Sequence, residues 1–175
     1  MIIKETSLKD VLVIEPVEHK DLRGSFMESF RYDIISEKTK VNYKFVQDNL
    51  VQSKKNVLRG LHYQKEYPQG KLIQVLKGEI FDVAVDINKD SSTYGKWHAE
   101  VLSDKNKKQL FIPPGYAHGY CVLTDNSLVM YKCTDYYKSN DQYGIIWNDN
   151  KIGINWPVKK PIVSLKDSKL PNLTN

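Results

Sequence analysis

His62 is the first of two histidines whose surroundings could support chemistry. It lies in an apolar, strand-like segment, residues 56–64, that Arg59 and Gly60 interrupt. Arg59 and His62 would lie on opposite faces of a regular strand, so a bulge at Gly60 is needed if both serve one site. Such a histidine is either a hydrogen-bonded structural residue or a proton carrier, because its ordinary pKa of about 6.5 lies near neutral pH.

His118 is the second, and it follows a rigid turn, Pro113-Pro114-Gly115. The pattern Pro-x-Gly-x-x-His resembles the second motif of the cupin superfamily, whose fold is a small jelly-roll barrel. Metal-binding cupins usually add a His-x-His and a glutamate in the first motif, where this chain has His62-Tyr63-Gln64. Catalytic transition-metal sites normally take three protein ligands, so the sequence predicts no metal and leaves His62 free for proton transfer.

A proton carrier on one side of a substrate needs a partner on the other, and Tyr131 is available in the segment 128–137. The chain has eleven tyrosines, so simple packing is the alternative for any one of them. Lys71 directly follows Gly70 and opens the apolar run 72–76. It is either a solvent-facing cation or a group that stabilises a developing oxyanion.

Alternation with a period of two predicts the elements that must position these residues. In the segment 79–86, Val83 and Val85 fall on one face while Ile80 and Ala84 fall on the other, which is typical of a strand with different neighbours on its two faces. Similar runs occur at 11–14, 72–76, 110–112, 120–123 and 128–134. Turn residues separate them at intervals of about ten residues, which favours an antiparallel sandwich or barrel. We therefore expect an all-β fold of the jelly-roll barrel type.

Helix is scarce in this sequence. The best candidate spans residues 31–38, and residues 103–108 could hold one turn. The segment 157–175 contains three prolines, at positions 157, 161 and 171, and no alternation. We expect short flanking helices and an extended C-terminal tail wrapped on the fold.

Length and charge limit the classes of function. The chain has 175 residues, which suits one domain over residues 1–175. Its 26 basic and 21 acidic side chains give a net charge of +5 that is spread along the chain. No basic arm or motif for nucleic acid is present, and the excess favours a solvated surface with some capacity for small polyanions.

The expected compartment follows from the apolar runs and the cysteines. No run approaches the roughly 18 apolar residues that span a bilayer, and the N-terminus lacks the apolar stretch of a signal peptide. Cys121 and Cys133 each lie in a strand-like run, as buried free thiols do. We expect a cytoplasmic protein that binds no membrane.

Seven segments in order resemble one family nearly end to end. These segments are 21–28, 45–49, 56–64, 69–71, 111–120, 130–137 and 162–167. Together they resemble the dTDP-4-dehydrorhamnose 3,5-epimerases. The resemblance implies a cofactor-free homodimer of cupin-type jelly rolls that inverts C3 and C5 of a dTDP-linked 4-keto-6-deoxy sugar.

The resemblance also implies roles for individual residues. His62 matches the general base and Asp167 the carboxylate that orients it, while Tyr131 matches the general acid on the opposite face. Lys71 matches the cation that stabilises the enolate at the C4 ketone oxygen. Positions that hold the nucleotide, its diphosphate or the sugar are matched by Arg23, Glu28, Gln47, Asn49, Arg59, His118, Gln142 and Lys166. Many members carry glutamate where this chain has Gln142, which bears on the nucleotide contact.

Two alternatives stay open. The first is an epimerase that acts at C3 or C5 only, since one base and one acid suffice for either reaction. The second is a non-catalytic, metal-free cupin that binds sugar nucleotides and does not need His62, Tyr131 and Asp167 together. If the N-terminal strands are exchanged between subunits, Arg23 and Glu28 would enter the partner's site.

Overall fold

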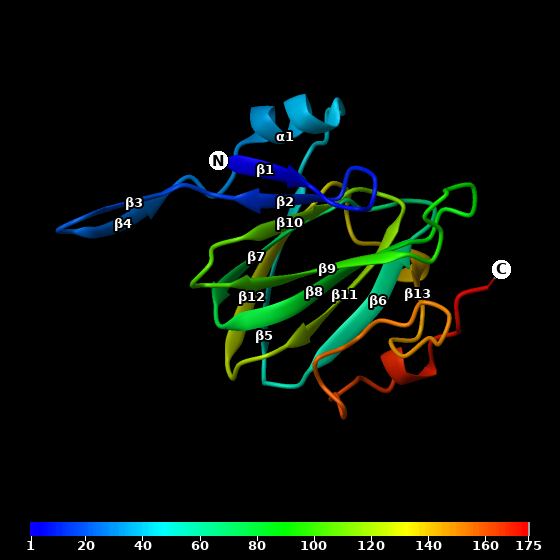
Figure 1. Cartoon of the computed structure of the whole chain (residues 1–175). Helices are drawn as coiled ribbons and strands as arrows, with labels where there is room; N and C mark the ends of the chain where they lie inside the picture. The colour runs from blue at the N-terminus through cyan, green and yellow to red at the C-terminus, as the bar shows by residue number, and fades with distance from the viewer. Residues whose placement is uncertain (175) are drawn as a thin grey trace.

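The computed structural model describes residues 1–174 and consists of two facing antiparallel β-sheets (Figure 1). The larger sheet contains, in spatial order, β1 (Ile2–Glu5), β2 (Leu12–Glu15), β10 (Gln109–Ile112), β7 (Lys71–Lys77), β12 (Ser127–Cys133) and β5 (Gln47–Ser53). The smaller sheet contains β13 (Gln142–Gly144), β6 (Leu58–Gln64), β11 (Tyr116–Val122), β8 (Glu79–Asp86) and β9 (Trp97–Ser103). Within residues 1–174, no strand pairing joins the two sheets into one closed barrel.

The remaining elements are small. A separate hairpin of β3 (Glu18–Asp21) and β4 (Gly24–Met27) projects away from the sheets (Figure 1). Helix α1 (Tyr32–Thr39) and the 3-10 turns η1 (Ser139–Asp141) and η2 (Asp167–Lys169) complete the described elements. The predicted all-β class with short flanking helices is confirmed. No helix of residues 1–174 has both the length and the apolar character needed to cross a membrane.

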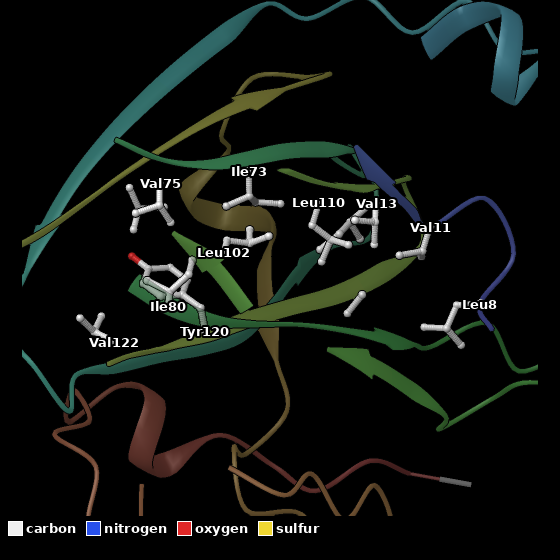
Figure 2. Packing of buried hydrophobic residues seen from close by; sticks show 13 residues of the cluster. Leu8, Val11, Val13, Ile73, Val75, Ile80, Leu102, Leu110, Tyr120 and Val122 are labelled. Carbon is white, nitrogen blue, oxygen red and sulfur yellow. The ribbon is translucent and has the colours of Figure 1, made fainter. Parts of the chain in front are cut away.

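The main core lies between the two sheets (Figure 2). Ile80 and Ala84 on β8 belong to the same buried cluster as Ile73 and Val75 on β7 of the facing sheet. Each aliphatic side chain that is fully buried here contributes about 1.5–3 kcal/mol to the stability of the fold. This core therefore fixes the separation of the sheets that carry the candidate site.

The opposite face of β8 packs against the chain that follows β13, and Leu173 of the C-terminal tail packs against the same cluster. Val83 and Val85 belong to a second buried cluster that includes Ile145 and Ile152. Along the tail, the Ile162 N–H donates to the Asn56 carbonyl at 2.7 Å, and the Leu58 N–H donates to the Ile162 carbonyl at 2.9 Å. The extended tail is thus confirmed, and its main chain is pinned to the start of β6. The two faces of β8 have the different neighbours that its sequence predicts.

A bulge lies between β6 and β11. Arg59 pairs with Tyr120, and His62 pairs with His118, so three steps along β6 match two steps along β11. This irregularity brings Arg59 and His62 to the same side, as a shared site requires. At Gly60 a Cβ atom would lie 2.6 Å from the Gly119 Cα, so the close approach of the two strands needs glycine.

Substitution of Gly60 tests this close approach. We expect Gly60→Ala to lower the free energy of unfolding by about 2–4 kcal/mol, because backbone atoms of β11 would have to move. Gly115→Ala is the matched control, since Gly115 also has a positive φ, +94°, but a Cβ there meets no atom within 4 Å. Urea unfolding should give about 1 kcal/mol for the control. Equal losses would contradict a steric role for Gly60.

Candidate active site

A cavity of about 520 Å³ opens between the sheets, and side chains from both sheets and from the tail line it. Eight of the predicted site residues line it: Arg59, His62, Lys71, His118, Tyr131, Gln142, Lys166 and Asp167. A neighbouring cavity of about 260 Å³ shares four of these and adds Gln47 and Asn49. Ten of the twelve predicted residues are therefore gathered at one place, although they come from distant parts of the sequence.

His62 and Asp167 form a hydrogen-bonded pair at this cavity. The His62 Nε2 lies 2.8 Å from the Asp167 Oδ1 across 105 residues of sequence. The Gly60 N–H donates to the Asp167 Oδ2 at 3.2 Å, and the Asp167 N–H donates to the Ser164 Oγ at 3.0 Å. Each oxygen of the Asp167 carboxylate therefore has a hydrogen-bond partner. Because the carboxylate is fixed, its bond to His62 also fixes the orientation of the imidazole ring.

The Asp167 carboxylate stays ionised in this setting. Burial favours its neutral form, but the hydrogen bond and charge of His62, with the Gly60 N–H and the Ser164 hydroxyl, lower its pKa below the ordinary 3.8. A carboxylate is only an acceptor, so a neutral His62 carries its proton on Nε2. The Nδ1 atom is then left as the basic nitrogen.

A second histidine–carboxylate pair lies beside the first. The His118 Nε2 is 2.8 Å from the Asp82 Oδ1, both side chains are buried, and the Cα atoms of His118 and His62 are register partners. Sequence reasoning missed Asp82. The available signal was a carboxylate on the core-facing side of β8, flanked by Ile80 and Ala84, because a buried carboxylate needs a partner.

Tyr131 and Lys71 face the cavity from the larger sheet, opposite His62 on the smaller sheet. Burial raises the pKa of Tyr131 above its ordinary value of 10.0, and the Cys133 thiol adds to this effect while Arg59 opposes it. Tyr131 therefore keeps its proton at neutral pH. Burial lowers the pKa of Lys71, although Cys133 and the Asp82 carboxylate favour its charged form.

The cavity thus has the His62 imidazole on one side, and the protonated Tyr131 phenol and the Lys71 amine on the other. Such a set can remove a proton from carbon beside a carbonyl, stabilise the resulting oxyanion and return a proton to the opposite face. Within residues 1–174, no group of three histidine, cysteine or carboxylate side chains is placed to hold a metal ion.

The predicted binding residues form short hydrogen-bonded chains at the cavity. The Arg59 guanidinium donates to the Ser53 Oγ at 3.2 and 3.3 Å. The Lys166 Nζ and the Tyr137 hydroxyl both donate to the Gln142 Oε1, at 2.5 and 2.8 Å. Tyr137 was not predicted; it lines the smaller cavity and lies six residues after Tyr131.

Arg23 and Glu28 lie elsewhere. Neither lines the two cavities of the described chain. Arg23 is on the projecting hairpin, with its side chain 90% exposed and paired with Asp21 at 2.5 Å. Glu28 follows the hairpin, exposed, and its nearest cation is Arg31 at 3.9 Å. A single chain does not bring these two residues to the site.

Comparison with known proteins decides the family. The family model described as dTDP-4-dehydrorhamnose 3,5-epimerase matches residues 5–175. The chain belongs to the dTDP-4-dehydrorhamnose 3,5-epimerase family. A dTDP-4-dehydrorhamnose 3,5-epimerase from Shigella flexneri is 50% identical over 168 residues, which cover 95% of this chain and 93% of the relative.

Solved structures of sugar-nucleotide epimerases share the fold. The Legionella pneumophila enzyme RmlC, in complex with dTDP-4-keto-L-rhamnose, matches with a TM-score of 0.95 and 44% identity, covering 98% of this chain and 92% of that one. ChmJ, a 3'-monoepimerase from Streptomyces bikiniensis in complex with dTDP-quinovose, matches with a TM-score of 0.91 and 28% identity, covering 96% and 86%. The fold is therefore shared by an enzyme named as a 3,5-epimerase and by one named as a 3'-monoepimerase.

The lowered pKa of Asp167 predicts how stability depends on pH. A carboxylate whose folded-state pKa is depressed stabilises the fold above its unfolded-state pKa, near 3.8, and loses this effect as the pH falls through the lower folded value. We expect Asp167→Asn to be less stable than the wild type by about 2 kcal/mol at pH 6, and this gap to shrink below about pH 4.

Urea unfolding of both proteins from pH 6 to pH 3 measures the gap. Asp125→Asn is a suitable control, because Asp125 is exposed and accepts only the Lys55 N–H. A gap that stays constant over this range would contradict the proposed ionised pair.

Proposed function

We propose that this chain inverts C3 and C5 of a dTDP-linked 4-keto-6-deoxyhexose, converting dTDP-4-dehydro-6-deoxyglucose to dTDP-4-dehydrorhamnose. The observation that carries the proposal is the His62–Asp167 pair opposite Tyr131 across one cavity, with Lys71 beside them, in a member of this family. The reaction moves protons only and changes no oxidation state, so side chains alone suffice and no cofactor is required.

The first step is removal of a proton from carbon beside the C4 ketone. The Nδ1 of His62 takes this proton, and Asp167 stabilises the imidazolium that forms. Charge then develops on the ketone oxygen, where the Lys71 ammonium compensates it. Asp82 favours the charged form of Lys71, which offsets part of the cost of burying that ammonium.

The second step is protonation from the opposite side. Tyr131 donates its proton to the face that His62 does not reach, and the configuration at that carbon inverts. Both C3 and C5 are bonded to C4, so the same ketone activates each of them. One base, one acid and one cation therefore serve both carbons.

The nucleotide is proposed to lie along the second group of residues. Arg59 and Lys166 supply cations for the diphosphate, and the fork of an arginine suits paired phosphate oxygens. Gln47, Asn49, His118 and Gln142 supply further polar donors and acceptors around the cavities. These cations, placed for the diphosphate, account for only part of the net charge of +5.

We further propose a homodimer in which Arg23 and Glu28 act in the partner's site. Support comes from the hairpin, which holds both residues away from their own cavity and leaves the apolar side chains of Leu22 and Phe26 exposed. A cytoplasmic location is proposed from the two cysteines, which are buried and unbridged. We propose no nucleic-acid or membrane partner.

Exchange of substrate hydrogens with deuterated water tests the catalytic assignment. Proton NMR of the 4-keto-6-deoxyglucose nucleotide with wild-type protein should show exchange at both C3 and C5. His62→Ala and Tyr131→Phe should each slow exchange about 10²- to 10⁴-fold, because each removes one positioned proton-transfer group.

The controls are His98→Asn and Tyr116→Phe, which lie outside both cavities and should exchange at the wild-type rate. Exchange at a single carbon in the wild type would replace the double reaction by a one-centre epimerase. Unchanged exchange in His62→Ala would contradict the role of this base. Binding without any exchange would favour a non-catalytic sugar-nucleotide protein.

A complementation experiment tests the exchange of residues between subunits. Neither Arg23→Ala nor His62→Ala should be fully active alone, but a mixed dimer would hold one intact site, with His62 from one chain and Arg23 from the other. Co-refolding equal amounts should therefore restore about a quarter of the wild-type activity, since half of the dimers are mixed and half of their sites are intact. Activity no higher than the mean of the two variants would place Arg23 in its own chain's site.

A further inference from the structure

Gln142 lies where the two cavities of the candidate site meet. It begins β13, is paired with Gln64 of β6, and lines both the larger and the smaller cavity. Its Oε1 atom accepts from the Lys166 Nζ of the larger cavity at 2.5 Å and from the Tyr137 hydroxyl of the smaller one at 2.8 Å. A lysine ammonium only donates, so its acceptor is the amide oxygen. One neutral oxygen therefore holds Lys166 at the cavity.

Both cations that the proposed function assigns to the diphosphate are anchored by neutral oxygens. Lys166 donates to the Gln142 amide, and Arg59 donates to the Ser53 hydroxyl. Among residues 1–174, no carboxylate forms an ion pair with either cation. Their positive charges are therefore not compensated by an ion pair within the chain and stay available to an anionic ligand.

The carboxylate next to Lys166 in the sequence is engaged elsewhere. Asp167 follows Lys166 directly, but its two oxygens accept from His62 and from the Gly60 N–H. Consecutive residues of the tail thus have different tasks. Asp167 compensates the charge that forms on His62, whereas Lys166 keeps its own charge for the ligand. This separation holds only if the residue that anchors Lys166 is itself neutral.

We propose that Gln142 is a positioning residue that holds Lys166 for the diphosphate without neutralising it, and so sets the affinity for the anionic part of the substrate. The inference rests on the proposed function, which makes the ligand a nucleoside diphosphate sugar. Glutamate has nearly the same shape as glutamine. At position 142 it would pair with Lys166, and its own charge would repel the diphosphate. It would also replace the amide N–H donors by an acceptor.

Gln142→Glu tests this role of the charge, with Gln52→Glu as the matched control. Gln52 is exposed on β5 and lines neither cavity, so the control adds the same charge away from Lys166. Calorimetric titration with dTDP near neutral pH measures the affinity. We expect Gln142→Glu to bind dTDP about five- to tenfold more weakly at low salt, and Gln52→Glu to bind it as the wild type does.

Salt separates an effect of charge from an effect of shape. The deficit of Gln142→Glu relative to the wild type should shrink as the ionic strength rises to about 0.5 M, because salt screens the added charge. In the exchange reaction, KM should rise by about the same factor as the dissociation constant of dTDP, with kcat close to that of the wild type, since the acid, the base and Lys71 are unchanged. Urea unfolding should show no loss of stability.

Two results would overturn the inference. One is equal affinity of the wild type and Gln142→Glu for dTDP, and the other is a deficit that stays constant as salt is added. The proposed function would still stand in either case, provided that the wild type exchanges hydrogens at C3 and C5. Wild-type protein that neither binds dTDP nor exchanges substrate hydrogens would overturn both.

Discussion

The hydrogen bond between His62 and Asp167 is the interaction on which the site depends. It joins a strand in the middle of the chain to the C-terminal tail and fixes which imidazole nitrogen is available as a base. The tail reaches this position because its main chain pairs with the start of β6 at Ile162. The bulge next to Gly60 completes the arrangement, since it turns Arg59 toward the same cavity and places the Gly60 N–H on the carboxylate.

Burial gives the remaining groups their chemical character. Asp82 is fully buried and Lys71 and Tyr131 are half-buried, so their charges interact more strongly than at the surface. Burial keeps Tyr131 protonated, and Asp82 supports the charge of Lys71 against the cost of desolvation. Acid, base and cation thus differ because of where the two sheets place them, and the apolar core between the sheets sets that placement.

Period-two alternation was sufficient to predict the central strands, because β7, β8 and β12 bury at least one regular face. It missed the β3–β4 hairpin and the strands β1, β5 and β9, most of whose residues are exposed or only half-buried. The need for a bulge at Gly60 followed from side-chain parity alone. The pairing of residues 62 and 167 across 105 positions could come only from the family resemblance, since no local pattern specifies it. Asp82 was overlooked although its place on an apolar strand face was visible in the sequence.

The tautomer of His62 is the most direct test of this account. Long-range proton–nitrogen NMR correlations of wild-type protein near pH 8.5, where an imidazole is neutral, report which ring nitrogen carries the proton. The hydrogen bond to Asp167 predicts the proton on Nε2 and an unprotonated Nδ1 ready to accept the substrate proton. A proton on Nδ1 would contradict the assignment of His62 as a base oriented by Asp167.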